Sequence, residues 1–97
     1  MRGDPITLVL ASPRDVDRLA LATLIEHWPA YCLLAAESSL EAAAVQCRRF
    51  LPHAALFDLG FSGDEVYSLT TRLAREGVVR AIGLLDVDFA FFRAKRT

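Results

Sequence analysis

The sequence predicts a single α/β domain, in which helices cover both faces of a parallel sheet. Short apolar segments alternate with longer amphipathic segments over residues 1–97. This alternation is typical of parallel strands joined by right-handed crossover helices. Apolar residues make up 54% of the chain and charged residues 24%, so a substantial core can be buried. No linker divides the 97 residues, which suit one domain.

The first strand and the first helix are predicted before Pro29. Residues 6–11, ITLVLA, are apolar and rich in strand formers. Ser12 is expected to cap the helix, with Pro13 in its first turn and Asp15 facing the positive end of the helix dipole. The apolar side of this helix is expected to comprise residues at helical spacing, widened by two more: Val16, Leu19, Ala20, Thr23, Leu24 and His27, with Leu21 and Ile25.

The second strand and helix are predicted between Tyr31 and Pro52. Residues 31–36, YCLLAA, read as a short apolar strand. Ser38 and Glu41 have the spacing of a capping box at the start of a helix. The apolar stripe of that helix is expected to comprise Leu40, Ala43, Ala44, Cys47 and Leu51.

The third strand delivers one carboxylate, Asp58, at its end. Residues 54–57, AALF, form an apolar run bounded by turn residues, as in a strand buried on both faces. Chemistry in open α/β sheets lies beyond the carboxyl ends of such strands, so Asp58 is a functional candidate as well as a turn residue. Gly60 follows, and Ser62 precedes Glu65 at capping-box spacing. The next helix is expected to bury Val66, Leu69, Thr70 and Leu73 and to end at Gly77.

A fourth strand region is predicted over residues 78–85, and Asp86 or Asp88 is expected to cap a final short helix. Residues 81–85 carry no charge and no proline, so they lack the usual devices that block pairing at a sheet edge. We therefore expect a homo-oligomer that uses the fourth-strand edge, the final helix, or both. That helix would carry Phe89, Phe91 and Phe92.

Composition and motifs exclude several classes of protein. The net charge of −1 gives no basic surface, no apolar run is long enough to span a membrane, and the N-terminus lacks the features of a signal peptide. We expect a cytoplasmic protein that binds neither nucleic acid nor membrane. No glycine-rich phosphate loop, zinc-ligand spacing or nucleophile–base set is present, so an enzyme is not expected. Cys32 and Cys47 are expected to be buried thiols, and His27 and His53 to be structural.

With this order of elements, the chain resembles a response-regulator receiver domain, the phospho-accepting module of bacterial two-component signalling. The similarity covers residues 6–97 and is carried by residues 38–43 (SSLEAA) and 51–63 (LPHAALFDLGFSG). It implies a flavodoxin-like three-layer sandwich with strand order 2-1-3-4-5, here without the fifth strand and its helix. It also implies phosphorelay signal transduction, with a histidine kinase or another signalling protein as partner.

The resemblance makes Asp58 the phospho-acceptor and lets Asp58, with the backbone carbonyl of Gly60, contact Mg²⁺. Receivers hold this ion with two acidic residues after the first strand, but Ser12 and Pro13 stand there, and they are poor ligands for a hard cation. A serine or threonine usually ends the fourth strand, where this chain has Leu85. The lysine that pairs with the phosphate belongs to the absent fifth strand.

Three functions remain open at this point. The first is a receiver in which Asp58 accepts phosphate, with Asp15, Asp86 and Asp88 as partial replacements for the lost acids or simply as helix caps. The second is a pseudo-receiver that acts by protein interaction or dimerisation without phosphorylation, which the loss of the Mg²⁺ ligands favours. The third is a small enzyme or ligand-binding domain with a pocket near Asp58. Since no opposite charge is assigned near Asp58, Asp58→Asn is expected to leave the fold intact, and to stabilise it slightly if Asp86 lies close enough to repel Asp58.

Overall fold

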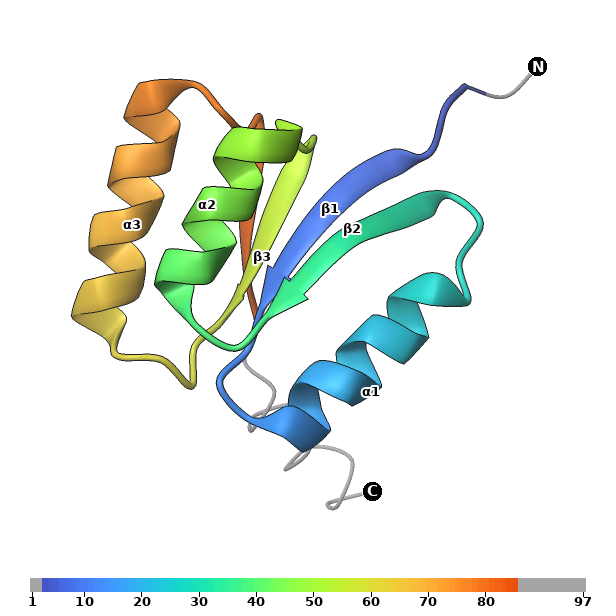
Figure 1. Cartoon of the computed structure of the whole chain (residues 1–97), viewed down its shortest axis with the longest axis horizontal. Helices are drawn as coiled ribbons and strands as arrows, with labels where there is room; N and C mark the ends of the chain where they lie inside the picture. The colour runs from blue at the N-terminus through green and yellow to red at the C-terminus, as the bar shows by residue number, and fades with distance from the viewer. Residues whose placement is uncertain (1–2, 86–97) are drawn as a thin grey trace.

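The computed structural model describes residues 3–85. In this part of the chain four parallel strands form one sheet in the order β2-β1-β3-β4, and three helices alternate with them (Figure 1). The predicted α/β class with a parallel sheet is therefore confirmed. The final helix predicted after Asp86 or Asp88 lies outside the described residues. The elements are β1 (Ile6–Ala11), α1 (Asp15–Glu26), β2 (Tyr31–Glu37), α2 (Leu40–Phe50), β3 (Ala54–Asp58), α3 (Gly63–Glu76) and β4 (Ala81–Leu85).

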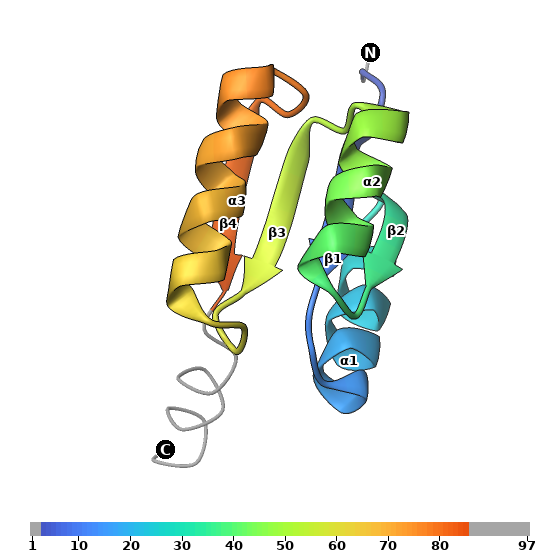
Figure 2. The ribbon, with the colours of Figure 1, turned by 60° about the vertical axis from the view of Figure 1, so that its left-hand side comes forward.

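The two faces of the sheet are covered by different helices. On one face α1 packs against β1 and β2, whereas α2 and α3 lie side by side on the other (Figures 1 and 2). A bidentate ion pair joins the two neighbouring helices, because Arg48 Nε and Nη2 donate to the Glu76 carboxylate at 2.9 and 3.2 Å. The main core lies between α2, α3 and the sheet, and it consists of Val9, Ala11, Leu40, Ala43, Ala44, Cys47, Ala55, Phe57, Val66, Leu69 and Leu73.

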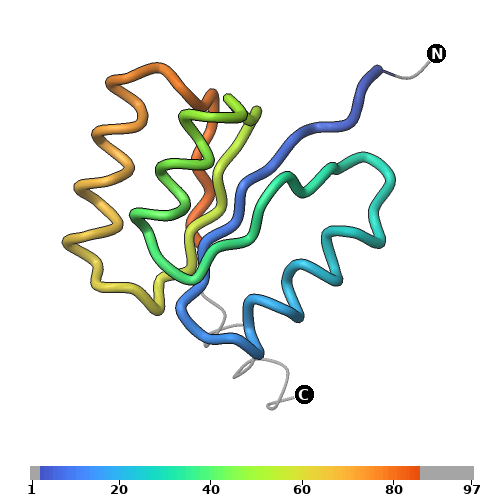
Figure 3. Tube along the Cα trace, in the orientation of Figure 1, coloured from blue at the N-terminus to red at the C-terminus, as the bar shows by residue number. Residues whose placement is uncertain are grey.

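The strand order brings together segments that are far apart in the sequence. β1 and β3 are the inner strands and run in parallel, as the trace in Figure 3 shows, although α1, β2 and α2 separate them along the chain. Ala11 at the end of β1 pairs with Phe57, the penultimate residue of β3. Ser12 follows Ala11 and Asp58 follows Phe57. Ser12 and Asp58 therefore meet at the carboxyl edge of the sheet.

The predicted apolar side of α1 is wrong at most of its positions, but it correctly includes Ile25. Val16 and Leu19 are 78% and 69% exposed, whereas Ile25 is buried at 5%. The helix has apolar residues around most of its circumference, so periodicity alone did not define which side faces the sheet. The stripes predicted for α2 and α3 are correct except at two positions: Leu51 lies beyond the end of α2 and is exposed, and Thr70 is half-buried.

Two of the predicted helix starts are also wrong. Arg14, not Ser12, is the N-cap of α1, and its side chain makes no capping hydrogen bond. At α2 the cap is Ser39, one residue later than predicted, and its hydroxyl accepts a 3.1 Å hydrogen bond from the Ala42 N–H. The C-terminal cap of α3 is Gly77 with φ of 73°, as predicted.

Cys32 and Cys47 have different environments. Cys47 is fully buried in the main core, as predicted, but Cys32 is exposed because β2 is an edge strand of the described sheet. His53 has the predicted structural role: its Nδ1 accepts a 2.9 Å hydrogen bond from the Thr7 N–H, and its own N–H donates to Thr7 Oγ1 at 3.0 Å. These bonds join the starts of β1 and β3.

Candidate functional site at the carboxyl ends of β1 and β3

Asp58 is the last residue of β3, and it is almost completely buried. Its side chain lies beside Ser12, which follows β1; the two residues are 3% and 0% exposed. Ser12 and Asp58 are the two polar residues that are buried among residues 3–85. A buried carboxylate is costly unless hydrogen bonds replace its lost water, so its partners decide what it can do.

Both carboxylate oxygens of Asp58 accept a hydrogen bond from the protein. The Ser12 hydroxyl donates to Oδ2 at 2.8 Å, and the Gly60 N–H donates to Oδ1 at 2.8 Å. Gly60 suits this close turn, because a Cβ there would lie 3.3 Å from Asp58 Oδ1 and 3.3 Å from Pro13 Cγ. These two hydrogen bonds give Asp58 a structural role, so the lack of an assigned opposite charge is not a sufficient reason to expect Asp58→Asn to be harmless.

Arg18 holds the segment around Ser12 from the side of α1. Its Nη1 donates to the Ser12 carbonyl at 3.0 Å, and its Nη2 pairs with Asp15 Oδ1 at 2.5 Å. The side chain of Asp15 is 88% exposed, so it points into solvent and does not join Asp58. Sequence reasoning missed Arg18, because an arginine in the first turns of an amphipathic helix gives no sign of an inward direction.

The described residues do not fit a Mg²⁺ site. Mg²⁺ prefers oxygen ligands in octahedral geometry, commonly with one or two carboxylates. Within residues 3–85 no three His, Cys, Asp or Glu side chains gather in one place. Ser12 already donates its hydroxyl to Asp58, and Pro13 has no ligand atom in its side chain. Gly60 faces Asp58 with its N–H. Asp86 and Asp88 lie outside the described residues.

Leu85 lies where the receiver resemblance would require a hydroxyl. It is paired in register with Asp58 on the neighbouring strand, and its carbonyl accepts a 2.8 Å hydrogen bond from the Leu59 N–H. Leu85 therefore ends β4 directly beside Asp58. An apolar side chain there cannot hydrogen-bond to a group attached to the carboxylate.

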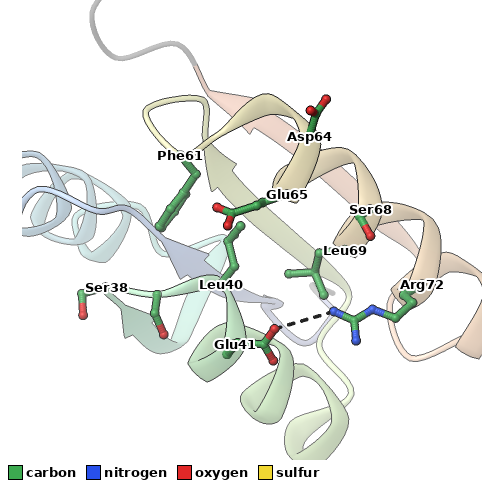
Figure 4. Close-up of a pocket in the computed structure, with 10 residues that line it drawn as sticks. Ser38, Leu40, Glu41, Phe61, Asp64, Glu65, Ser68, Leu69 and Arg72 are labelled. Carbon is green, nitrogen blue, oxygen red and sulfur yellow. Dashed lines mark ion pairs between the residues drawn. The ribbon is translucent and has the colours of Figure 1, made fainter.

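A groove of about 490 Å³ lies at the same edge of the molecule, between the first turns of α2 and α3 (Figure 4). Asp58 does not line it, so the groove and the buried carboxylate are separate features. The Glu41 carboxylate lies 3.9 Å from Arg72 Nη2 across the groove. Its lining comprises Ser38, Ser39, Leu40, Glu41, Phe61, Asp64, Glu65, Ser68, Leu69 and Arg72.

Together, fold and site define an α/β domain with a buried, hydrogen-bonded carboxylate at the carboxyl edge of a parallel sheet. Comparison of the chain with models of known protein families, with curated proteins and with solved structures finds no match. Among residues 3–85, no helix combines the length and the apolar character that crossing a membrane requires.

Proposed function

We propose that this domain is a receiver-like module of signal transduction that acts through protein contacts and not through phosphoryl transfer. The strand order β2-β1-β3-β4 agrees with the first four strands of a flavodoxin-like receiver. Asp58 ends β3, and Leu85 lies next to it, as the resemblance implies. These agreements support the receiver-like fold, while the chemistry of the site supports a function without phosphate.

The closed environment of Asp58 carries the proposal. To attack phosphorus, a carboxylate needs a free oxygen in line with the incoming group and positive charge to offset the charge that develops on the phosphoryl oxygens. Both oxygens of Asp58 already accept hydrogen bonds, and only 3% of the residue is exposed. Phosphorylation would turn one of these oxygens into an ester oxygen, which is a weaker acceptor for the hydrogen bond from Ser12 or Gly60, and no three His, Cys, Asp or Glu side chains gather among the described residues to hold a metal.

Incubation with acetyl phosphate and Mg²⁺, followed by mass spectrometry of the intact protein, tests the proposal. We expect no phosphorylated species in the wild type, and none in Asp58→Asn. Rapid, near-stoichiometric phosphorylation that is lost in Asp58→Asn would contradict the proposal. It would instead favour the second candidate function, a phosphorelay receiver that a histidine kinase phosphorylates. The position of Asp58 at the end of β3 supports this candidate.

The partner of such a module is a second copy of this chain or another signalling protein. β4 lies at the edge of the described sheet, and Leu84 on it is 53% exposed. An exposed apolar edge strand is a ready template for pairing with another chain. We therefore propose self-association through β4 as one way in which the domain acts.

A further inference from the structure

The backbone of β4 determines how another strand can pair with its outer edge. The Ala81 N–H and the Leu85 carbonyl both form hydrogen bonds with residues that flank β3, so both residues direct their backbone groups toward β3. In a parallel strand the backbone groups of alternate residues point to opposite edges. The N–H and C=O groups of Ile82 and Leu84 therefore point away from β3, where the sheet formed by residues 3–85 has no further strand.

A hollow of about 210 Å³ lies beside this edge, on the face of the sheet that α3 covers. It is lined by Thr70 and Ala74 of α3 and by residues 79–82. Ile82 packs against the main core, so its side chain points to the α3 face. Leu84 lies two residues later in the strand, so it points to the same face, and it is 53% exposed. One edge of the molecule therefore has both a hollow and an exposed leucine on the same face.

We propose that two copies of the chain pair antiparallel through β4, with Ile82 of each copy opposite Leu84 of the other. This inference rests on the self-association through β4 proposed above, and it gives that association a register and a packing contact. In this register the outward N–H and C=O groups of both residues all form hydrogen bonds across a two-fold axis at Gly83. A shift in either direction would place Ile82 opposite Ile82, or Leu84 opposite Leu84. The outward groups of the other residue would then have no partner in β4.

The same register places the Leu84 side chain of each copy at the hollow of the other. Opposite residues of an antiparallel pair have neighbouring side chains on one face, and Ile82 lines the hollow. Leu84 then packs on Ile82, Thr70 and Ala74 of the other copy, and its exposed apolar surface is removed from water. Backbone pairing alone would accept any extended strand. The match between an exposed leucine and a hollow on the same edge favours a second copy of this chain.

Disulfide trapping in the full-length chain tests the register. Ala81 of one copy and Leu85 of the other would form a non-hydrogen-bonded pair with Cα atoms about 4.5 Å apart, within the range that a disulfide spans. The background is Cys32→Ser, with Cys47 left in place because it is buried. Under mild oxidation, a mixture of Ala81→Cys and Leu85→Cys chains should form disulfide-linked heterodimers at close to the yield that random mixing allows. Neither variant alone should cross-link, because the two copies of one residue would lie roughly 13 Å apart along the strands.

Ala74→Trp, in the chain without introduced cysteines, tests the packing contact. The indole would fill the space that Leu84 of the other copy needs, so the dissociation constant of the dimer should rise about tenfold or more. Ser68→Trp is the matched control, because Ser68 is exposed on the flank of α3 that faces α2, and it should leave the constant unchanged. Analytical ultracentrifugation measures both constants.

The following results would overturn the proposal. Leu84→Cys or Ile82→Cys chains that cross-link with themselves more efficiently than the mixed pair would show a shifted register. Efficient cross-linking of Ala81→Cys alone would show parallel pairing. A dimer that Ala74→Trp leaves intact would place the contact elsewhere. A monomeric wild type would overturn both this register and self-association through β4, but not the absence of phosphoryl transfer, which the acetyl phosphate experiment tests separately.

Discussion

The Ser12 hydroxyl donates a 2.8 Å hydrogen bond to Oδ2 of Asp58, a residue 46 positions later in the sequence. The bond joins the carboxyl ends of the two inner strands, and it uses the residue that stands where a receiver would hold its metal. The serine supplies a hydroxyl donor to Asp58 and no carboxylate that could bind a metal ion. The following predictions test this relationship and the parts of the fold that support it.

Ser12→Ala should destabilise the domain. It removes one of two donors to a buried carboxylate, and a buried acceptor that loses its partner costs about 1–3 kcal/mol. Urea denaturation of the two proteins measures the difference. Ser68→Ala is the matched control, because Ser68 is exposed and its replacement should change the free energy of unfolding by less than about 0.5 kcal/mol. Equal effects of the two changes would contradict the structural role of Ser12.

Ser12→Asp with Pro13→Asp should create a Mg²⁺ site, for which residues 3–85 of the wild type lack a suitable set of ligands. Three carboxylates would then face one another, so without metal the variant should melt below the wild type through like-charge repulsion. Mg²⁺ at about ten times its dissociation constant should raise the free energy of unfolding of the variant by roughly 1.4 kcal/mol. Thermal melts with MgCl₂ and with NaCl of equal ionic strength make the comparison. If Mg²⁺ stabilises the wild type equally, the conclusion that its residues do not fit a Mg²⁺ site is wrong.

Leu51→Gly and Gly77→Ala should shift stability in opposite directions. Leu51 at the end of α2 and Gly77 at the end of α3 both have positive φ, 50° and 73°. Leu51 is 63% exposed, so glycine there loses little burial and should add about 0.5–1 kcal/mol to the free energy of unfolding. A Cβ at Gly77 meets nothing within 4 Å, so the expected loss of about 1 kcal/mol is purely conformational. Denaturation curves that shift in the same direction would contradict this.

The two cysteines should react at very different rates. A thiol reagent at pH 8 should modify exposed Cys32 quickly and should reach Cys47 only after unfolding. Burial raises the pKa of the Cys47 thiol from its ordinary 9.0 to about 11, so its reactive thiolate is scarce in the folded protein. Counting modified thiols by mass spectrometry, with and without urea, gives the answer. Two fast thiols in the native protein would be the opposite result.

The same pKa shift predicts a dependence of stability on alkaline pH. The folded state favours the neutral thiol of Cys47. The stability that this thiol contributes to the folded state is therefore fully present below pH 9 and is lost as pH rises toward 11. Cys47→Ala should start from a lower stability, because it leaves a cavity, but should lose less over this range. If the free energy of unfolding falls equally with pH in the wild type and in Cys47→Ala, other groups account for the loss of stability at alkaline pH.

Self-association through β4 should be sensitive to Leu84. At micromolar concentration, size-exclusion chromatography with light scattering should show a dimer or larger assembly, and Leu84→Lys should reduce its mass, because the side chain is 53% exposed. Ile82 is a poor test, since it packs against the main core. Val16→Lys, on the exposed side of α1, is the matched control. A monomeric wild type would exclude this edge as an assembly surface.

Elements with one apolar stripe were predictable, and elements with ambiguous patterns were not. Leu40, Ala43, Ala44 and Cys47 follow a single helical stripe, and all four are buried. In α1 the apolar residues surround the helix, so only the position of β2 beside β1 decides that Ile25 faces inward. The end of β2 at Glu37 and the start of β4 at Ala81 differ from prediction, because strand ends depend on the neighbouring strand.

At the candidate site the sequence predicted the position of Asp58 but not its environment. A carboxylate after a buried strand is visible as a pattern. The assignment of Ser12 as a helix cap was reasonable locally, since serine favours that position. This assignment is wrong because the hydroxyl of Ser12 donates to the buried carboxylate of Asp58, 46 residues later in the sequence. A local sequence pattern does not contain such a long-range contact.

The interior position of β1 also has a consequence for synthesis of the chain. β1 is made first, but its second neighbour, β3, ends at Asp58, 47 residues after Ala11. At about 5–20 residues per second, a ribosome needs roughly 2–9 s to produce that interval. During this time one edge of a very apolar nascent strand has no native partner. Chaperone contact with β1 on the ribosome would therefore be useful until β3 emerges.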